Sequence, residues 1–141
     1  MAAIEDSLRR TLDRYRREVE REARVERMVL FGSHARGTAD RWSDVDVAVV
    51  SPDFEDVGRA ISVLARARVR VDPSIAPLAF TPKQWDEAGP TSIVVEIKRY
   101  GAPVYDVARA ALDASIDLGL AQAARGETVP AREIIERLRK L

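Results

Sequence analysis

The first regular pattern along the chain is helical. Between residue 4 and about residue 23, apolar side chains recur at every third or fourth position, at Ile4, Leu8, Leu12, Tyr15 and Val19. This spacing predicts an amphipathic helix with one apolar face. The opposite face carries arginines among acidic neighbours. We interpret it as a solvated surface with i,i+4 ion pairs rather than as a nucleic-acid surface.

Two apolar stretches then follow with the spacing of strands. We predict strands at Val25–Phe31 and Val45–Val50, joined by a Gly32-Ser33 turn, a short helix and a loop. In the second strand the valines alternate with polar or small residues. Because successive side chains of a strand point to opposite faces, one face of this strand enters the core and the other carries Asp46.

The middle of the chain alternates between helical and extended patterns. We predict a helix from about Glu55 to Ala67, with Val57, Ile61 and Leu64 facing inward. The remaining predicted elements are an extended segment at Val69–Phe80, a short helix opened by Thr81-Pro82, a helix over Ser92–Tyr100 stopped by Gly101, and a short extended segment at Pro103–Tyr105.

The last part of the chain is purely helical in pattern. An alanine-rich helix ends near Gly126 and carries the stripe Leu112, Ile116 and Leu120, and another helix begins near Thr128 with Ile134, Ile135 and Leu138 on one side. We therefore predict a domain over residues 1–106 and a helical tail over residues 107–141. Periodicity alone leaves open whether the tail packs on the domain or forms a docking or dimerising arm.

Composition limits the classes of function. The 141 residues suit one domain with a real core, and the 23 basic and 23 acidic residues balance to a net charge of zero. Without a basic field, nucleic acid is not the expected partner. No cysteine is present, no stretch has the length of an apolar membrane span, and the amphipathic start is unlike a signal peptide. We expect a cytoplasmic protein.

The candidate chemistry lies between the two predicted strands. Ten residues separate Ser33 from Asp44, and Asp46 follows two positions later. Two aspartates at i and i+2 of a strand share a face, with Cα atoms roughly 6.5 Å apart. Each can reach one of two divalent metals spaced about 3.5–4 Å apart. Gly32 lets a phosphate approach the backbone, and the amides that follow face it, so this stretch has the parts needed to hold a nucleoside triphosphate with magnesium.

The stretch GSHARG…SDVDVAVV resembles the minimal nucleotidyltransferases of the DNA polymerase beta superfamily, whose signature is GS, ten residues and DxD. The resemblance covers roughly Val25 to Asp106. It implies an α/β (α+β) nucleotidyltransferase fold, with a small mixed sheet flanked by helices. It also implies ATP as the substrate and two Mg²⁺ ions held by Asp44 and Asp46.

The resemblance extends to further site residues. It implies phosphate contacts from Gly32, Ser33, Arg36 and Ser43, and a third carboxylate on a later strand. Asp72 is the candidate for this carboxylate, as a third metal ligand and as the group that orients or deprotonates the acceptor hydroxyl. Pro73 departs from the family pattern, since proline is confined to edges or bulges of a sheet. For Asp72 the alternative is a turn-capping aspartate, for Arg36 a surface pair with Asp40, and for Ser33 a helix cap. For Asp44 and Asp46 the alternative is a pair of turn or edge-strand carboxylates in an enzyme that has lost activity.

Other residues near these elements are weaker candidates for the site. We expect His34 to be a local polar neighbour of the turn, because magnesium prefers oxygen ligands. Lys98 and Arg99 lie on a predicted helix. We expect their side chains to face solvent, and contact with a triphosphate is the alternative. Trp42 precedes Ser43 and can cover either the site or the core.

The group that accepts the AMP is implied only by the family resemblance. Stand-alone relatives resemble antitoxins paired with a helical HEPN-type toxin, which implies AMP transfer from ATP to a tyrosine hydroxyl of the toxin. The short C-terminal segment leaves little chain for a self-contained small-molecule pocket. Two alternatives stay open: a nucleotidyltransferase acting on a small hydroxyl-bearing molecule, with the pocket completed by a homodimer, and an antitoxin that neutralises its partner by docking without catalysis.

Overall fold

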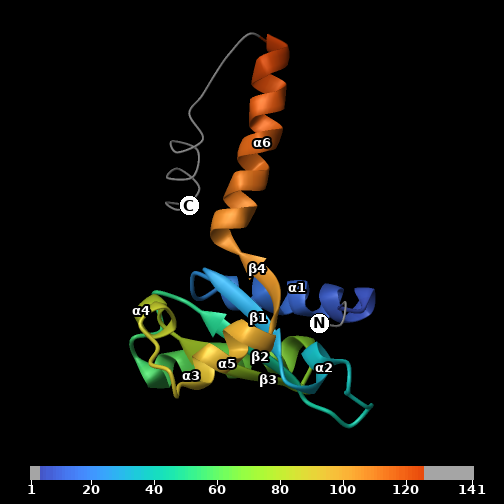
Figure 1. Cartoon of the computed structure of the whole chain (residues 1–141), viewed down its shortest axis with the longest axis vertical. Helices are drawn as coiled ribbons and strands as arrows, with labels where there is room; N and C mark the ends of the chain where they lie inside the picture. Colours follow the sequence, from blue (N-terminus) through green and yellow to red (C-terminus); the bar gives the residue numbers. More distant parts are fainter. Residues whose placement is uncertain (1–3, 126–141) are drawn as a thin grey trace. The chain divides into compact units, whose positions relative to one another are not determined.

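The computed structural model describes residues 4–125 and divides the chain into two units, Met1–Val104 and Tyr105–Leu141 (Figure 1). The first unit contains the turn and the aspartate pair that the sequence singles out. The second begins within the last strand and continues as a helix. Among the helices of the described residues, none combines the length and the apolar character that crossing a membrane requires.

A four-stranded sheet forms the centre of the first unit. Its strands are β1 (Arg27–Phe31), β2 (Val45–Val50), β3 (Ile75–Phe80) and β4 (Ala102–Asp106), in the order β3-β2-β1-β4. β1 and β2 run antiparallel, and β2 and β3 run parallel, so the sheet is mixed. The predicted fold class, a small mixed sheet flanked by helices, is confirmed.

One face of the sheet packs against α1 (Asp6–Glu20) and α3 (Val57–Val71). The predicted stripe of α1 is buried at its centre, where Leu12, Tyr15 and Val19 are fully enclosed. The Tyr15 hydroxyl donates a hydrogen bond to the Leu64 carbonyl oxygen of α3 at 3.2 Å. Burial raises the pKa of this hydroxyl, so Tyr15 stays a neutral donor that joins the two helices.

Two predictions about α3 are wrong: which of its side chains are buried, and where the helix ends. Val57 and Ile61 are 67% and 62% exposed, because the buried stripe is Ala60, Val63, Leu64 and Ala67. Val69–Val71 belongs to α3 rather than to an extended segment. The helix ends at Asp72 because a residue before proline is pushed out of the α region, and Asp72 has φ −158° and ψ 113°.

The opposite face of the sheet packs against α4 (Pro82–Asp86) and α5 (Ile93–Tyr100). The cluster between them consists of Val29, Ala48, Val50, Trp85, Val94 and Ile97. α4 begins with the capping box of Thr81, and the Ser92 side chain caps α5. The predicted helix starts at Thr81-Pro82 and Ser92 are therefore confirmed.

The second unit contains α6 (Val107–Arg125), which the Asp106 carboxylate caps by accepting a hydrogen bond from the Ala108 amide at 2.9 Å. Ala111 and Ser115 are buried, whereas Leu112 and Ile116 of the predicted stripe are exposed. The predicted helix near Thr128 and the rest of the tail lie outside the described residues.

Candidate active site

The site forms where β1 ends and β2 begins. In the antiparallel register Phe31 pairs with Asp46, so Gly32, the next residue of β1, emerges beside the Asp46 side chain. Gly32 has φ 72° and ψ −153°, a conformation that favours glycine. A Cβ atom at Gly32 would overlap the Asp46 carboxylate. Glycine at this position therefore lets the turn and the carboxylate lie in direct contact.

Asp46 is partly buried and makes no hydrogen bond or ion pair with the described part of the chain. Burial raises the pKa of its carboxyl group above the usual aspartate range, and the nearby Asp44 carboxylate raises it further. His34 and Arg36 oppose these effects, but the net direction is upward. The folded protein thus holds a carboxylate whose charge its own side chains do not balance.

These residues fit a divalent cation with oxygen ligands. Asp44 is exposed and precedes β2 directly, so two carboxylates two positions apart lie at the same end of the strand. Hard cations such as Mg²⁺ take carboxylate oxygens and complete their coordination with water and phosphate oxygens. Among the described residues no group of three acidic, histidine or cysteine side chains is close enough to enclose a metal. Asp44 and Asp46 are therefore an open, two-carboxylate donor set.

The predicted phosphate-contacting residues lie on α2 (Ser33–Arg36) and the turn before it. Gly32 is the N-cap residue, and Ser33 is the first helical residue without a capping hydrogen bond from its side chain. The cap predicted for Ser33 is thus wrong. Arg36 reaches back, and its Nε donates to the Gly32 carbonyl oxygen at 3.4 Å. In the described structure Arg36 faces the turn rather than pairing with Asp40.

Ser43 belongs to a tightly hydrogen-bonded loop. Its hydroxyl accepts a hydrogen bond from the Asp40 amide at 3.0 Å and donates one to Asp40 Oδ1 at 3.2 Å. Asp40 Oδ1 also accepts a hydrogen bond from the Trp42 amide at 2.8 Å. His34 Nε2 lies 3.4 Å from the Ser43 carbonyl oxygen and links α2 to this loop. The Trp42 side chain is 79% exposed and covers no core.

Asp72 does not lie on a strand beside the aspartate pair, and that part of the prediction is wrong. It ends α3, and its Oδ1 accepts hydrogen bonds from the Ser74 amide at 2.9 Å and the Ser74 hydroxyl at 2.7 Å. This is the geometry of the turn-capping alternative. The residue that pairs with Asp46 on β3 is Ala76. A catalytic role for Asp72 stays a prediction without support from its position.

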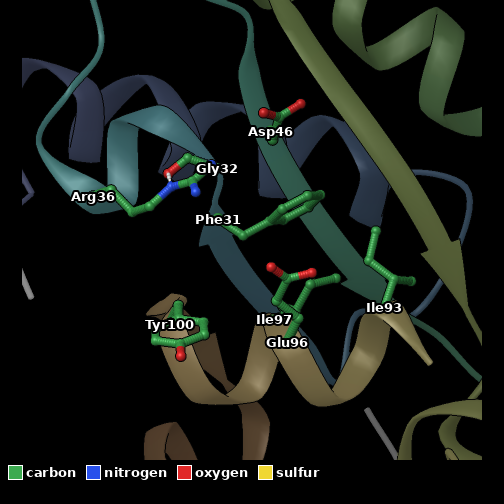
Figure 2. Close-up of a pocket in the computed structure, with 8 residues that line it drawn as sticks. All are labelled: Phe31, Gly32, Arg36, Asp46, Ile93, Glu96, Ile97 and Tyr100. Atoms are coloured by element: carbon green, nitrogen blue, oxygen red, sulfur yellow. Dashed lines mark hydrogen bonds between the residues drawn. The ribbon is translucent and has the colours of Figure 1, made fainter. Parts of the chain in front are cut away.

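A cavity of about 240 Å³ opens between the aspartate end of β2 and α5 (Figure 2). Gly32, Arg36 and Asp46 give it one polar wall, Phe31 also lines it, and α5 contributes Ile93, Glu96, Ile97 and Tyr100. The pattern of α5 residues at positions 93, 96, 97 and 100 is the sequence signal by which this wall could have been predicted.

The basic residues predicted on this helix do not contribute to the cavity wall. Lys98 donates a hydrogen bond from Nζ to the Trp85 carbonyl oxygen at 2.6 Å, and it lies 5.3 Å from the centre of the Trp85 ring. Arg99 is exposed. Lys98 therefore ties α5 to α4, and the cavity has a single basic side chain, Arg36, among its lining residues.

Comparisons with known proteins agree with this geometry. Residues 12–104 match the family model described as "Nucleotidyltransferase domain". A protein of Methanocaldococcus jannaschii named "putative protein adenylyltransferase" is 31% identical over 84 residues, which are 57% of this chain and 80% of that protein. The crystal structure of a "putative nucleotidyltransferase" from Sulfolobus solfataricus aligns with a TM-score of 0.54 and 16% identity, over 71% of this chain and 81% of the other. At this identity the second likeness shows the shared fold.

Proposed function

This chain belongs to the nucleotidyltransferase domain family, and from that premise we propose that it transfers AMP from ATP to a hydroxyl group with Mg²⁺. The observation that carries the proposal is the Asp46 carboxylate. It is partly buried, lacks a hydrogen-bond partner within the described residues and lies against the Gly32 turn. A carboxylate in this position gains most from a cation, and the turn beside it leaves the backbone open to a phosphate.

The proposed roles follow from position. Asp44 and Asp46 hold the two Mg²⁺ ions, while Gly32, Ser33 and Arg36 contact the β- and γ-phosphates. When bound, Mg²⁺ neutralises the charge that develops on the phosphate oxygens. Ser43 holds the loop before Asp44 through its bonds to Asp40, and phosphate contact by its hydroxyl requires exchange of those bonds.

The reaction is an in-line displacement. The acceptor oxygen attacks the α-phosphorus, the bond from that phosphorus to the α,β-bridging oxygen breaks, and pyrophosphate leaves with the electron pair. Most of the rate enhancement comes from holding the reactants in line and from balancing charge. The residues of this chain supply both through the turn and the carboxylate pair.

We propose that the acceptor is a tyrosine hydroxyl of a partner protein, of the HEPN-type toxin class that the sequence resemblance implies. The cavity of about 240 Å³ is smaller than the roughly 300–1,000 Å³ of pockets that enclose a whole ligand. A reactant must therefore be held partly from outside. The name of the M. jannaschii relative supports a protein acceptor.

The test is mass spectrometry of the purified chain incubated with Mg-ATP and the protein encoded by the neighbouring gene. We expect the partner to gain one or more AMP masses on tyrosine, and we expect no gain with Asp44→Asn. Transfer instead to a small hydroxyl compound by a dimer would identify the small-molecule alternative. Partner binding without any Mg-ATP binding would contradict the proposal and leave an antitoxin that acts by docking.

A further inference from the structure

The sheet beside Asp46 offers no group that can take the proton of the acceptor. In the parallel register, Ala76 of β3 lies next to Asp46, and the next residues on that face are Leu78 and Phe80. Phe80 packs against the core cluster under α4 and α5, which confirms that this face of the sheet is the one that these helices cover. Asp44 and Asp46 are engaged if they hold the metal ions. A neutral hydroxyl still needs a base, so the base must come from another element.

Glu96 is the one other carboxylate among the residues that line the cavity. It lies on α5, and Figure 2 shows its carboxylate pointing from that helix toward Phe31 and the wall that carries Asp46. Of the other wall residues of α5, Ile97 follows it directly, and Ile93 and Tyr100 lie one turn before and one turn after it. Glu96 thus occupies the middle of the wall opposite the aspartate pair.

The packing of α5 fixes the face of the helix on which Glu96 lies. Val94 and Ile97 of α5 are buried in the core cluster. Gly101 ends the helix, and a Cβ atom there would overlap the Ile97 carbonyl oxygen and the Val29 side chain. This close contact of α5 with β1 leaves the helix little freedom to rotate, so residue 96 remains on the cavity side.

Glu96 is also free to act. Within the described residues its carboxylate makes no hydrogen bond or ion pair, and it joins no three-member metal-binding group with Asp44 and Asp46. Its side chain is exposed, so an acceptor that arrives from solvent can reach it. An unpaired carboxylate outside the metal set, directed at the reaction space, has the properties of a general base.

We infer that Glu96 is the general base of the transfer, an inference that rests on the proposed function. As the acceptor oxygen forms its bond to the α-phosphorus, its proton passes to the Glu96 carboxylate. The bond to the bridging oxygen breaks, and pyrophosphate leaves with that electron pair. Glu96 then returns the proton to water. Glu96 takes the role that the sequence assigns to Asp72.

The test compares Glu96→Gln, Glu96→Asp, Asp72→Asn and the exposed control Glu87→Gln, using the acceptor that the wild-type chain modifies. We expect Glu96→Gln to lower kcat about 100- to 1,000-fold, the range of general base catalysis. The acceptor KM and the Mg-ATP affinity, measured by calorimetry without acceptor, should change by less than about threefold. Glu96→Asp should recover part of kcat, and the other two variants should stay within about threefold of wild type.

The outcomes separate the inference from the function on which it rests. A raised acceptor KM with unchanged kcat would mean that Glu96 recognises the acceptor, and this would overturn the inference. Loss of kcat in Asp72→Asn but not in Glu96→Gln would return the role to Asp72. If Asp44→Asn abolishes transfer while Glu96→Gln does not, only the inference fails. If the wild-type chain transfers nothing, the proposed function fails and the inference with it.

Discussion

The two ends of β2 carry aspartates in opposite states. At the start of the strand, Asp46 has no hydrogen-bond partner among the described residues, and its pKa is raised. Just past the end of the strand, Asp53 accepts hydrogen bonds from Arg24: from the amide at 2.8 Å, from Nε at 3.2 Å and from Nη2 at 2.9 Å. These bonds to the Arg24 side chain and amide lower the pKa of Asp53.

The difference shows how the chain uses the same residue type for two purposes. Arg24 satisfies the Asp53 carboxylate, and the Asp53 amide donates a hydrogen bond to the buried Ser51 hydroxyl at 3.0 Å, so Asp53 holds the connection between β2 and α3 and stabilises the fold. Asp46 lowers stability slightly and leaves its oxygens open to a cation. An unpaired, partly buried carboxylate is the costly state, and we attribute its presence to function.

The largest expected effect contrasts the two carboxylates in catalysis. Asp46→Asn should lower AMP transfer by at least about 1,000-fold, because the proposed metal ligand is lost at the reacting phosphate. The matched variant Asp53→Asn should retain activity within about threefold. Initial rates of pyrophosphate release at saturating Mg-ATP measure both. Similar losses in the two variants would show that the contrast between the ends of β2 has no functional meaning.

The next effect concerns the turn that lies against Asp46. Gly32→Ala should weaken Mg-ATP binding at least about tenfold and destabilise the fold by about 1–3 kcal/mol, because its Cβ overlaps the carboxylate at a positive φ. Calorimetric titration and thermal melting provide the two readouts. Gly58→Ala in α3 is the control, since its Cβ has only an ordinary contact with Asp56, and it should bind Mg-ATP normally.

A smaller effect is expected in the stability contributed by Asp53. Asp53→Asn should lower the free energy of unfolding by about 1 kcal/mol at pH 7, because the neutral amide has one acceptor oxygen in place of two and no charge to strengthen the hydrogen bonds from Arg24. The effect stays small because the exposed guanidinium pair is screened. Since the folded pKa is lowered, this contribution is present above the ordinary aspartate pKa and is lost as the pH falls through the folded value. Chemical denaturation at pH 7 and pH 3 should show the difference shrinking.

The smallest expected effect is a gain in stability rather than a loss. Asp46→Asn should raise Tm by about 1–3 °C at pH 7 without Mg²⁺, because it removes a carboxylate whose folded pKa is raised. The advantage should shrink as the pH falls through the raised folded pKa and vanish well below about 4, the ordinary aspartate pKa, where Asp46 is protonated in both states. Thermal melting across this range checks the sign. A lower Tm for the variant at pH 7 would mean that Asp46 stabilises the fold and is not held for a ligand.

The fold was predictable wherever one pattern dominated the local sequence. The stripe of α1, the two strands around the Gly32 turn and the caps at Thr81 and Ser92 all form as the sequence indicates. The segment Val69–Val71 misled because its alternation is shorter than a strand, while the helical stripe before it continues. A preference over three residues yields to a helix that is already packed on the sheet.

The site was predictable on one side only. Gly32, Ser33, Asp44 and Asp46 lie on adjacent segments of a hairpin, so their spacing in sequence fixes their relation in space. The opposite wall comes from α5, about 50 residues later, and its approach depends on the Gly101 contact and the core under the helix. The spacing of residues 93, 96, 97 and 100 indicates that they share one face of a helix, but only the tertiary arrangement places that face opposite Asp46, which is why the sequence pointed to Asp72 and not to Glu96.

The pairing of Phe31 with Asp46 also bears on how this protein can be altered. A slip of one residue between β1 and β2 would turn Asp46 toward the core and bring valines to the surface, so the chemistry and the fold would fail together. The loop between Gly37 and Ser43 is constrained as well, because hydrogen bonds among Asp40, Trp42 and Ser43 hold it in place before Asp44. Inserted sequence, a reporter tag or a tethered acceptor therefore belongs outside the segment from β1 to β2, where both the alignment of the hairpin and the bonds of this loop are left intact.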